Sequence, residues 1–330
     1  MMRIALTGDV MLGRLIDQYV IQNRSVRPDA LWGDVLPVML SADCRLVNLE
    51  CVISSQGTEW RPTTKAFHFR ARPRTIDFLS AAKINGVTLA NNHVLDYGSE
   101  ALLDCFQLLD QAGIKRTGAG ATMEEALAPL VLDLPEGRVA VVALTDNEPE
   151  WEATKTKLGV NYVAYGDRGL KEPYRSRMTQ ALQSARRQGD FVILSAHVGP
   201  NWGEPSKHIQ ALAHDLIDMG ADLYWGHSNH TLQGIECYKG KAILYSTGDF
   251  VDDYWVDKDE RNDLSFLFML EVEQGRIARI RLHPTCIEDL GVRLANEQEA
   301  SFLKKSITMK CETFGVKIAF ENHVGIVTVN

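Results

Sequence analysis

Long apolar runs are absent from this 330-residue sequence. No stretch reaches the roughly 18 apolar residues that a membrane-spanning helix requires, and the apolar segment at 4–6 is too short for the apolar core of a signal peptide. The sequence therefore predicts a cytoplasmic protein with no membrane span, or one whose export signal is not part of this chain.

Cysteines are few and irregularly placed. The six cysteines form no CxxC pair and show no regular spacing. This pattern argues against a zinc ribbon and against the disulfide framework of a small secreted protein. Cys44, Cys51 and Cys105 lie beside apolar runs, so we expect them to be buried free thiols.

Basic residues are in the minority, with 35 Lys and Arg against 43 Asp and Glu, and the net charge is -8. We therefore expect no nucleic-acid partner, although a local basic groove is compatible with this balance. Three catalytic motifs are also missing, namely GxSxG, GxxxxGKS/T and HExxH. Without them, a serine esterase, a P-loop enzyme or a zincin protease has no support in the sequence.

What the sequence does contain is an alternation of short apolar runs with longer helical patterns, which is typical of a layered α/β fold. Strands are predicted at 3–6, 45–49, 86–90, 139–144, 191–196 and 222–225, and helices at 31–40, 74–83, 101–111, 177–188 and 208–219. Beyond residue 226 we expect two hairpins, 231–246 and 265–282, then a helix at 297–312 and an extended segment at 316–329. No linker or repeat divides the chain, so we expect a single domain over 1–330.

Five of the predicted strands end in polar residues that are able to bind a metal or act in catalysis. These residues are Asp9, Glu50, Asn91, Asn92, His93, His197, His227 and His230. In open α/β sheets such groups meet at the carboxyl ends of the strands. Taken singly, Asp9 is explained as a helix cap and Asn91 as a turn residue. Histidines at three strand ends together indicate one shared site.

The mixture of residue types indicates the chemistry of that site. Carboxylates and an amide oxygen combined with imidazoles suit Mn, Fe, Co or Zn. A carboxylate that bridges two such ions holds them roughly 3.5–4 Å apart, where they activate a water and polarise a phosphoryl or carbonyl oxygen. A histidine that is not a ligand is able to protonate the leaving group. The sequence therefore predicts a metal-dependent hydrolase.

Five segments carry a family resemblance: GDVMLGR at 8–14, VNLE at 47–50, LANNHVLDYG at 89–98, GHSNHTLQGIE at 226–236 and LYSTGDF at 244–250. They resemble the CapA family, which is associated with bacterial poly-γ-glutamate capsule synthesis and is related to the calcineurin-like metallophosphoesterases. The resemblance implies an α/β fold of the metallophosphoesterase-like type, a four-layer α/β/β/α sandwich with two mixed sheets. It covers about 3–253, and strands and a helix in 260–330 are expected to complete the fold.

The resemblance also implies a role for each site residue. One or two divalent ions, Mn, Fe or Zn, would be held by Asp9, Glu50, Asn92, His197, His227 and His230, with Glu50 as the bridging ligand. His93 would be the catalytic acid, and Arg14, Asn48 and Asn91 are candidates for substrate binding, because a guanidinium matches phosphate and carboxylate geometry. The neighbouring acids Asp249, Asp252 and Asp253 either support the ligands from behind or form a hydrated rim, and we expect the rim.

The sequence departs from the phosphoesterase pattern at two positions. The first motif of those enzymes is Asp-x-His, and here the second member is Met11, whose thioether is a poor ligand for a hard or borderline cation. The two histidines of the last motif, His227 and His230, are spaced by three instead of two. One metal position is therefore predicted to be weak, empty or differently arranged.

Two functions remain open from the sequence, with a vestigial structural or signalling module as a third. The first is a metal-dependent hydrolase of the CapA type that acts on a small phosphoester or an amide, linked to poly-γ-glutamate metabolism. The alternative is a non-catalytic accessory protein that binds poly-γ-glutamate or another anionic polymer during its synthesis or export. The lack of a membrane anchor in the sequence favours the enzyme.

Overall fold

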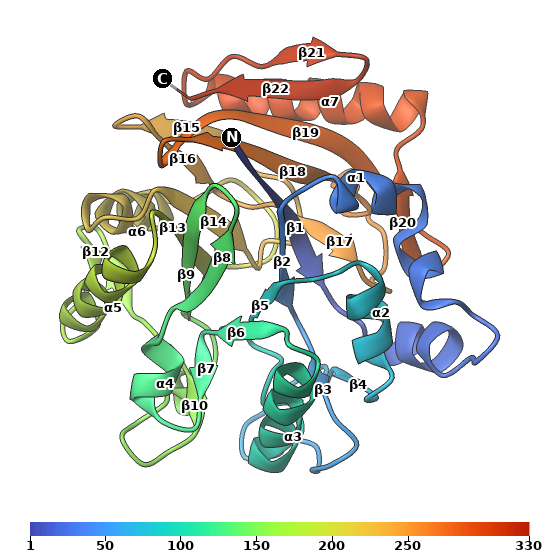
Figure 1. Ribbon diagram of the computed structural model, residues 1–330, viewed down its shortest axis with the longest axis vertical. Helices are drawn as coiled ribbons and strands as arrows, with labels where there is room; N and C mark the ends of the chain where they lie inside the picture. Colours follow the sequence, from blue (N-terminus) through green and yellow to red (C-terminus); the bar gives the residue numbers. More distant parts are fainter. Residues whose placement is uncertain (330) are drawn as a thin grey trace.

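The computed structural model describes residues 1–329 and contains two mixed β-sheets that face each other (Figure 1). The larger sheet has the strand order β21-β22-β19-β18-β1-β2-β5-β6, with β17 beside β1 and β20 beside β19. Its strands are β1 (Met2–Val10), β2 (Cys44–Leu49), β5 (Gly86–Thr88), β6 (Lys115–Thr117), β17 (Asp249–Val251), β18 (Leu264–Glu273), β19 (Arg276–Glu288), β20 (Gly291–Leu294), β21 (Ala319–Glu321) and β22 (Val324–Thr328).

The smaller sheet has the order β15-β16-β14-β13-β9-β8. Its strands are β8 (Leu130–Leu134), β9 (Gly137–Thr145), β13 (Phe191–His197), β14 (Leu223–His227), β15 (Ile235–Tyr238) and β16 (Lys241–Leu244). Three two-stranded pairs lie outside these sheets: β3 (Val52–Ile53) with β4 (Arg70–Ala71), β7 (Ala119–Gly120) with β10 (Gly159–Val160), and β11 (Tyr165–Gly166) with β12 (Gly169–Leu170). Each main sheet has a parallel centre, β1-β2-β5-β6 in one and β9-β13-β14-β16 in the other.

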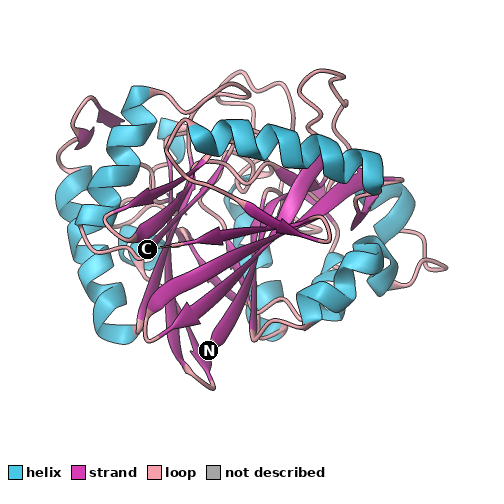
Figure 2. Cartoon of the chain, turned by 90° about the horizontal axis from the view of Figure 1, so that it is seen from above, coloured by secondary structure: helices cyan, strands magenta, loops and turns pink. Residues whose placement is uncertain are grey.

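Helices cover the outer faces of both sheets, as Figure 2 shows with strands in the middle and helices on either side. The α-helices are α1 (Leu36–Leu40), α2 (Thr75–Ala81), α3 (Gly98–Gln111), α4 (Met123–Leu127), α5 (Tyr174–Gln188), α6 (Lys207–Asp218) and α7 (Glu297–Glu312). Shorter or irregular turns are η1 (Ile16–Ile21), η2 (Pro28–Val35) and η3 (Pro149–Trp151).

The apolar core is divided into three clusters because successive side chains of a strand point to opposite faces. In β9, Val139 and Val141 belong to the cluster between the sheets, whereas Ala140 and Val142 belong to the cluster that includes α5 and α6. A third cluster joins the other face of the larger sheet to α2 and α3. Three apolar interfaces separate four layers, so the predicted four-layer α/β/β/α sandwich with two mixed sheets is confirmed.

The C-terminal segment, which the resemblance does not cover, contributes to the core between the sheets. Phe268 of β18, Leu303 and Ile307 of α7 and Val327 of β22 belong to the same apolar cluster as Leu6 of β1. Figure 1 shows α7 lying along β19 and β22 at the top of the molecule.

The predicted helix at 31–40 is wrong as a single element. The chain forms the 3-10 turn η2 and then α1, with a kink at Gly33, where φ is +47°. A Cβ at Gly33 would lie 2.4 Å from the carbonyl oxygen of Val292. Close approach to β20 therefore interrupts a segment whose local pattern favours a continuous helix.

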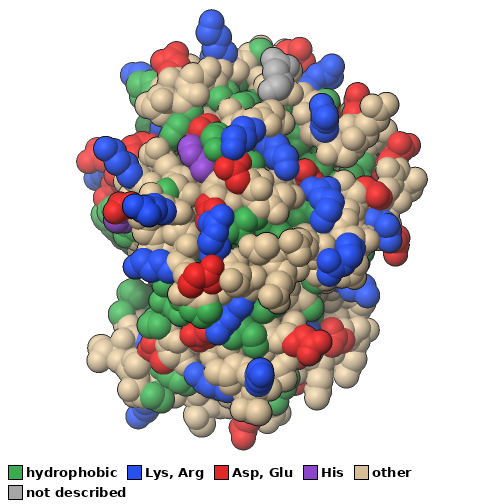
Figure 3. Space-filling model, turned by 90° about the vertical axis from the view of Figure 1, so that its left-hand side faces the viewer, with side chains coloured by type: hydrophobic (Ala, Val, Ile, Leu, Met, Phe, Trp, Pro, Cys, Tyr) green, Lys and Arg blue, Asp and Glu red, His purple; other side chains and the backbone are tan. Residues whose placement is uncertain are grey.

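The cysteines, the helices and the surface charges match what the composition predicts. All six cysteines are free thiols, and Cys44, Cys51 and Cys105 are buried as predicted. None of the helices in residues 1–329 combines the length and apolarity needed to cross a bilayer. On the face shown in Figure 3, Lys and Arg side chains alternate with Asp and Glu.

Candidate metal centre

The polar residues predicted at strand ends converge at one edge of the sandwich. Asp9 is near the end of β1, Glu50 directly follows β2, and Asn92 and His93 follow β5. From the opposite sheet come the last residues of β13 and β14, His197 and His227. Asp9, Glu50, His197 and His227 are each no more than 1% exposed.

Asp9 lies at the centre of this cluster. Its Oδ1 atom accepts a hydrogen bond from Asn48 Nδ2 at 2.7 Å and lies 3.1 Å from His227 Nδ1. Its Oδ2 atom accepts from the backbone N–H of Ser228 at 3.2 Å and lies 3.9 Å from His230 Nδ1. The two carboxylate oxygens therefore face two different groups of candidate ligands.

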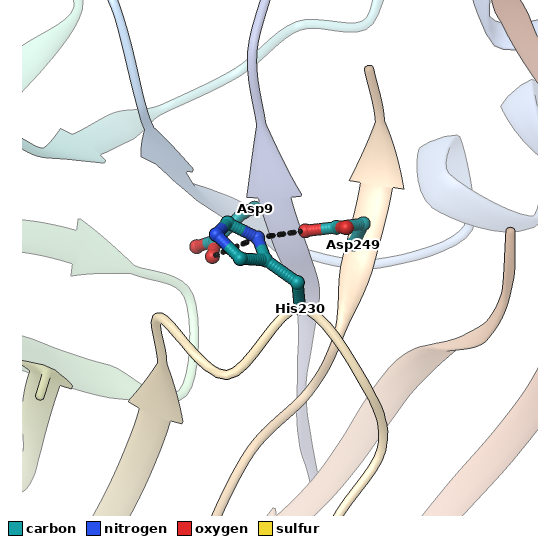
Figure 4. Close-up of side chains that lie close together, drawn as sticks. All are labelled: Asp9, His230 and Asp249. Atoms are coloured by element: carbon teal, nitrogen blue, oxygen red, sulfur yellow. Dashed lines mark hydrogen bonds and ion pairs between the residues drawn. The ribbon is translucent and has the colours of Figure 1, made fainter. Parts of the chain in front are cut away.

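The loop that carries His230 has an unusual backbone. Ser228 and His230 have φ values of +80° and +62°, a region that non-glycine residues seldom adopt. This conformation directs the N–H of Ser228 and the ring of His230 toward Asp9 (Figure 4). Strain of this kind concentrates at functional sites, where the surrounding structure enforces it.

On the Oδ1 side of Asp9, Glu50 and His197 complete a second group of ligand atoms. His197 Nε2 lies 3.7 Å from Glu50 Oε1 and 3.0 Å from the amide oxygen of Asn92. Asp9, Glu50 and His197 each offer one ligand atom within 4.8 Å of the others, as do Asp9, His230 and Asp249. The resemblance implies Glu50 as the bridging ligand, whereas in this structure Asp9 is the residue common to both groups.

The electrostatics of the cluster fit a bound cation. Burial raises the pKa of Glu50 well above its usual value, and the nearby Asp9 and Asp249 raise it further. Burial also raises the pKa of Asp9, but His197 and His227 lower it to well below the ordinary range. Glu50 Oε1, Asp249 Oδ2 and His227 Nε2 are buried and have no hydrogen-bond partner among residues 1–329. A divalent cation would satisfy these atoms and neutralise the clustered carboxylates, so these groups are able to hold a metal ion.

Asn48 and Asn91 lie beneath the cluster and are fully buried. Asn48 Nδ2 donates to Asp9, and its Oδ1 accepts from Thr88 Oγ1 at 3.0 Å. Asn91 Nδ2 donates to the carbonyl of Leu49 at 2.9 Å. Their amides are hydrogen-bonded within the protein, and neither residue lies on the cavity wall.

His93 is held in one orientation by a carboxylate. Its Nδ1 atom lies 2.6 Å from Asp96 Oδ2, and its Nε2 atom faces Glu50 Oε1 at 3.9 Å. Phe69 stacks on the imidazole with ring centroids 3.8 Å apart. Burial raises the pKa of Asp96 to about 7, while the cation Lys65, 3.4 Å away, opposes that rise.

A cavity of about 550 Å³ opens beside the cluster. Its wall includes Arg14, Asn92, His93 and His230 of the predicted set, together with Lys65, Phe67, Trp202, Tyr254 and Trp255. Arg14 is 3.3 Å from Asp253 Oδ1 and stays partly exposed. A larger cavity, about 790 Å³, lies between α4 and α5 and contains none of the cluster residues.

The predicted hydrated rim of acids is wrong. Asp249 and Asp252 are 1% and 4% exposed, and the side chain of Asp253 is fully buried. The residues are buried because Asp249 begins β17, which pairs with β1 inside the larger sheet, and Asp252 and Asp253 directly follow that strand. No role was predicted from the sequence for two further residues of the site, Asp96 and Tyr254. Tyr254 Oη donates to Glu50 Oε2 at 3.0 Å.

The chain is therefore a four-layer α/β/β/α sandwich with a buried cluster of carboxylates and imidazoles at the carboxyl ends of its strands. The sequence profile described as "Bacterial capsule synthesis protein PGA_cap" matches residues 3–254, and the chain therefore belongs to that family. The resemblance drawn from the sequence motifs is confirmed.

Two curated relatives illustrate the relationship. A probable polyglutamine synthesis accessory protein of Mycobacterium tuberculosis (strain CDC 1551 / Oshkosh) is 30% identical over 357 residues, covering 96% of this chain and 92% of the relative. The capsule biosynthesis protein CapA of Bacillus anthracis is 29% identical over 253 residues, covering 76% of this chain and 59% of the relative.

A solved structure supports the fold. A hypothetical protein from Thermus thermophilus superposes with a TM-score of 0.53 at 15% identity, covering 87% of this chain and 100% of the other. At this identity the likeness concerns the fold alone.

Proposed function

We propose that this protein is a metal-dependent hydrolase that cleaves a phosphoester. The observation that carries the proposal is the position of His93. It is held by Asp96 and borders the same cavity as the ligand candidates Asn92 and His230. Hydrolysis by an activated water requires a proton donor beside a group of metal ligands, with both open to one cavity.

Each group has a distinct part in this proposal. Asp9, Glu50, Asn92, His197, His227 and His230 would hold the ion or ions, which supply a water of lowered pKa and polarise the phosphoryl oxygen. His93 donates a proton from Nε2 to the leaving oxygen while Nδ1 remains on Asp96. Phe69, stacked on His93, shields that proton from bulk water.

The cavity supports a small anionic substrate. Arg14 on its wall matches a phosphate in charge and geometry, and a volume of about 550 Å³ fits a small molecule or the end of a polymer. A γ-glutamyl amide offers a carboxylate to the same arginine, so amide hydrolysis is the second reaction to test.

The names of the relatives support an alternative function, that of an accessory protein which binds poly-γ-glutamate without turnover. Binding of this kind depends on charge and weakens as salt rises.

An assay separates the two functions. With Mn²⁺, p-nitrophenyl phosphate, bis(p-nitrophenyl) phosphate and γ-glutamyl p-nitroanilide are offered to the purified protein. Turnover of a phosphoester supports the proposal. Salt-sensitive polymer binding with no turnover of any of the three supports the accessory function.

Replacing the carboxyl of Asp96 is expected to impair His93 as a general acid. We expect Asp96→Asn to lower kcat by about 10- to 100-fold, with the metal content unchanged. Burial already lowers the pKa of His93. The carboxyl of Asp96, with a pKa of about 7, is ionised on the alkaline side of neutrality, where its negative charge favours protonated His93. Loss of that charge reduces the protonated fraction of His93 there. His93 must be protonated to act, so the decline of kcat with rising pH begins at a lower pH in the variant. An unchanged pH profile of kcat would contradict this role.

Arg14→Ala is expected to weaken substrate binding. A hydrogen bond to a charged group contributes about 1.5–3 kcal/mol, so KM for the phosphoester rises roughly 10- to 100-fold while kcat changes little. Steady-state kinetics measures both constants. Arg186→Ala is the control, because Arg186 pairs with Asp222 and does not line the cavity. An equal rise in KM for both variants would exclude a specific role of Arg14.

A further inference from the structure

Asp249 reaches the metal centre because of how β17 pairs. This strand lies parallel to β1, in a register that places Asp249 opposite Asp9. The two backbones are in close contact, since Asp9 N donates to the carbonyl of Gly248 at 2.9 Å. A Cβ at Gly8 would lie 2.2 Å from that same oxygen, so glycine at position 8 permits the approach.

The side chain of Asp249 points toward the same space as Asp9 and His230. Its Oδ1 atom lies 2.8 Å from His230 Nδ1, and the dashed lines of Figure 4 join His230 to both carboxylates. Asp249 is 1% exposed, no group among residues 1–329 donates a hydrogen bond to its second oxygen, Oδ2, and the buried carboxyl of Asp252 lies next to its own. Two adjacent buried carboxylates are unfavourable unless they share a proton or a cation lies close by.

Met11 does not supply a ligand in its place. Where the phosphoesterase pattern has a histidine, the sulfur of Met11 lies 3.1 Å from the backbone N–H of Gly13, within its own loop, and the side chain belongs to an apolar cluster. The position that loses this imidazole therefore has Asp9 Oδ2 and His230, together with Asp249.

We propose that Asp249 is a metal ligand that replaces the missing histidine of the first motif and shifts the preference of this position from Zn²⁺ toward Mn²⁺, relative to a position with histidine there. Two carboxylates with a single imidazole form a harder donor set than one in which a histidine stands in place of Asp249, and harder sets favour Mn²⁺. The other position, with Glu50, His197 and Asn92 beside Asp9 Oδ1, does not involve Asp249. The inference rests on the proposed metal-dependent function and adds a ligand and a selectivity to it.

The test titrates metal-free full-length protein with Mn²⁺ and follows free Mn²⁺ by electron paramagnetic resonance, which requires no activity. The wild type is expected to bind two ions. Asp249→Asn, which keeps the shape of the side chain, should bind one ion with unchanged Kd and the other at least about 10-fold more weakly. Asp249→His should bind both, and its Zn²⁺ to Mn²⁺ affinity ratio should rise at least about 10-fold at this position.

Asp253→Asn is the matched control, since Asp253 is buried in the same segment but contacts Arg14 and the N–H of Leu15. It should bind Mn²⁺ as the wild type does, and thermal melts establish that each variant is folded. Wild-type binding in Asp249→Asn would overturn the role of Asp249 and leave the proposed hydrolase intact. A wild type that binds no Mn²⁺ or Zn²⁺ would overturn the proposed function and this inference with it.

Discussion

Replacing His93 by glutamine is expected to lower kcat for phosphoester hydrolysis by about 10²- to 10⁴-fold, the usual contribution of a positioned acid or base. The imidazole is held between Asp96 and the stacked ring of Phe69, and its Nε2 atom faces the cluster. Glutamine fills similar space but does not donate a proton to a leaving group at neutral pH. Steady-state kinetics at saturating Mn²⁺ measures the effect.

Two observations accompany this prediction. Metal content and melting temperature should stay close to those of the wild type, because His93 is assigned no ligand role. His214→Gln is the control, since His214 pairs with Glu236 and does not line the cavity. If His93→Gln retains wild-type kcat, or loses activity only together with its metal, the proposed role of His93 as acid is wrong.

Replacing Asp9 by asparagine is expected to have the broadest effect, because Asp9 belongs to both ligand groups. We expect the variant to lose tightly bound metal at both positions and to show no measurable turnover. It should also lose the stabilisation that metal gives the native state, which is about 2.7 kcal/mol when free metal is 100 times its Kd. Elemental analysis and thermal melts with and without Mn²⁺ follow both effects.

Asp263→Asn is the control for Asp9→Asn. Asp263 is also a buried carboxylate, but it pairs with Arg261 at 2.7 Å and is in neither ligand group. The control should keep its metal and its Mn²⁺-dependent melting temperature. An Asp9→Asn protein that binds Mn²⁺ as tightly as the wild type would show that the ion sits elsewhere or that Asp9 is dispensable.

The convergence of strand-end residues was predictable because it follows from local patterns. Each of β1, β2, β13 and β14 is a largely buried run with a polar site residue at or just after its carboxyl end, and parallel strands bring such ends to one edge. The sequence alone therefore indicates that Asp9, Glu50, His197 and His227 meet.

The burial of Asp249 was not predictable in the same way. It depends on the parallel pairing of β17 with β1, a contact between segments far apart in the sequence. Locally, the segment 249–253 has three acids and only two apolar residues, Phe250 and Val251, which are too few to predict a strand inside the sheet. The missing histidine at Met11 was the one signal in the sequence that the ligand set had to be completed from elsewhere.

The contact between Asp96 and His93 was predictable from the sequence only in part. It lies three residues after His93, close enough for a local hydrogen bond, yet the segment is a turn and contains no regular helix. Whether the two side chains meet depends on Phe69, whose backbone N–H donates to the same carboxylate at 2.7 Å. That contact comes from β4 and its flanking loop, which only the folded chain brings near.

We infer that this buried cluster holds a divalent metal, and the metal content of the purified, untagged protein tests this claim without an assay of activity. Elemental analysis before and after chelation should find one or two equivalents of Mn, Fe or Zn per chain. After chelation, Mn²⁺ should raise the melting temperature of the protein. A well-folded protein that contains no stoichiometric metal, and whose melting temperature responds to neither Mn²⁺ nor Zn²⁺, would contradict the claim.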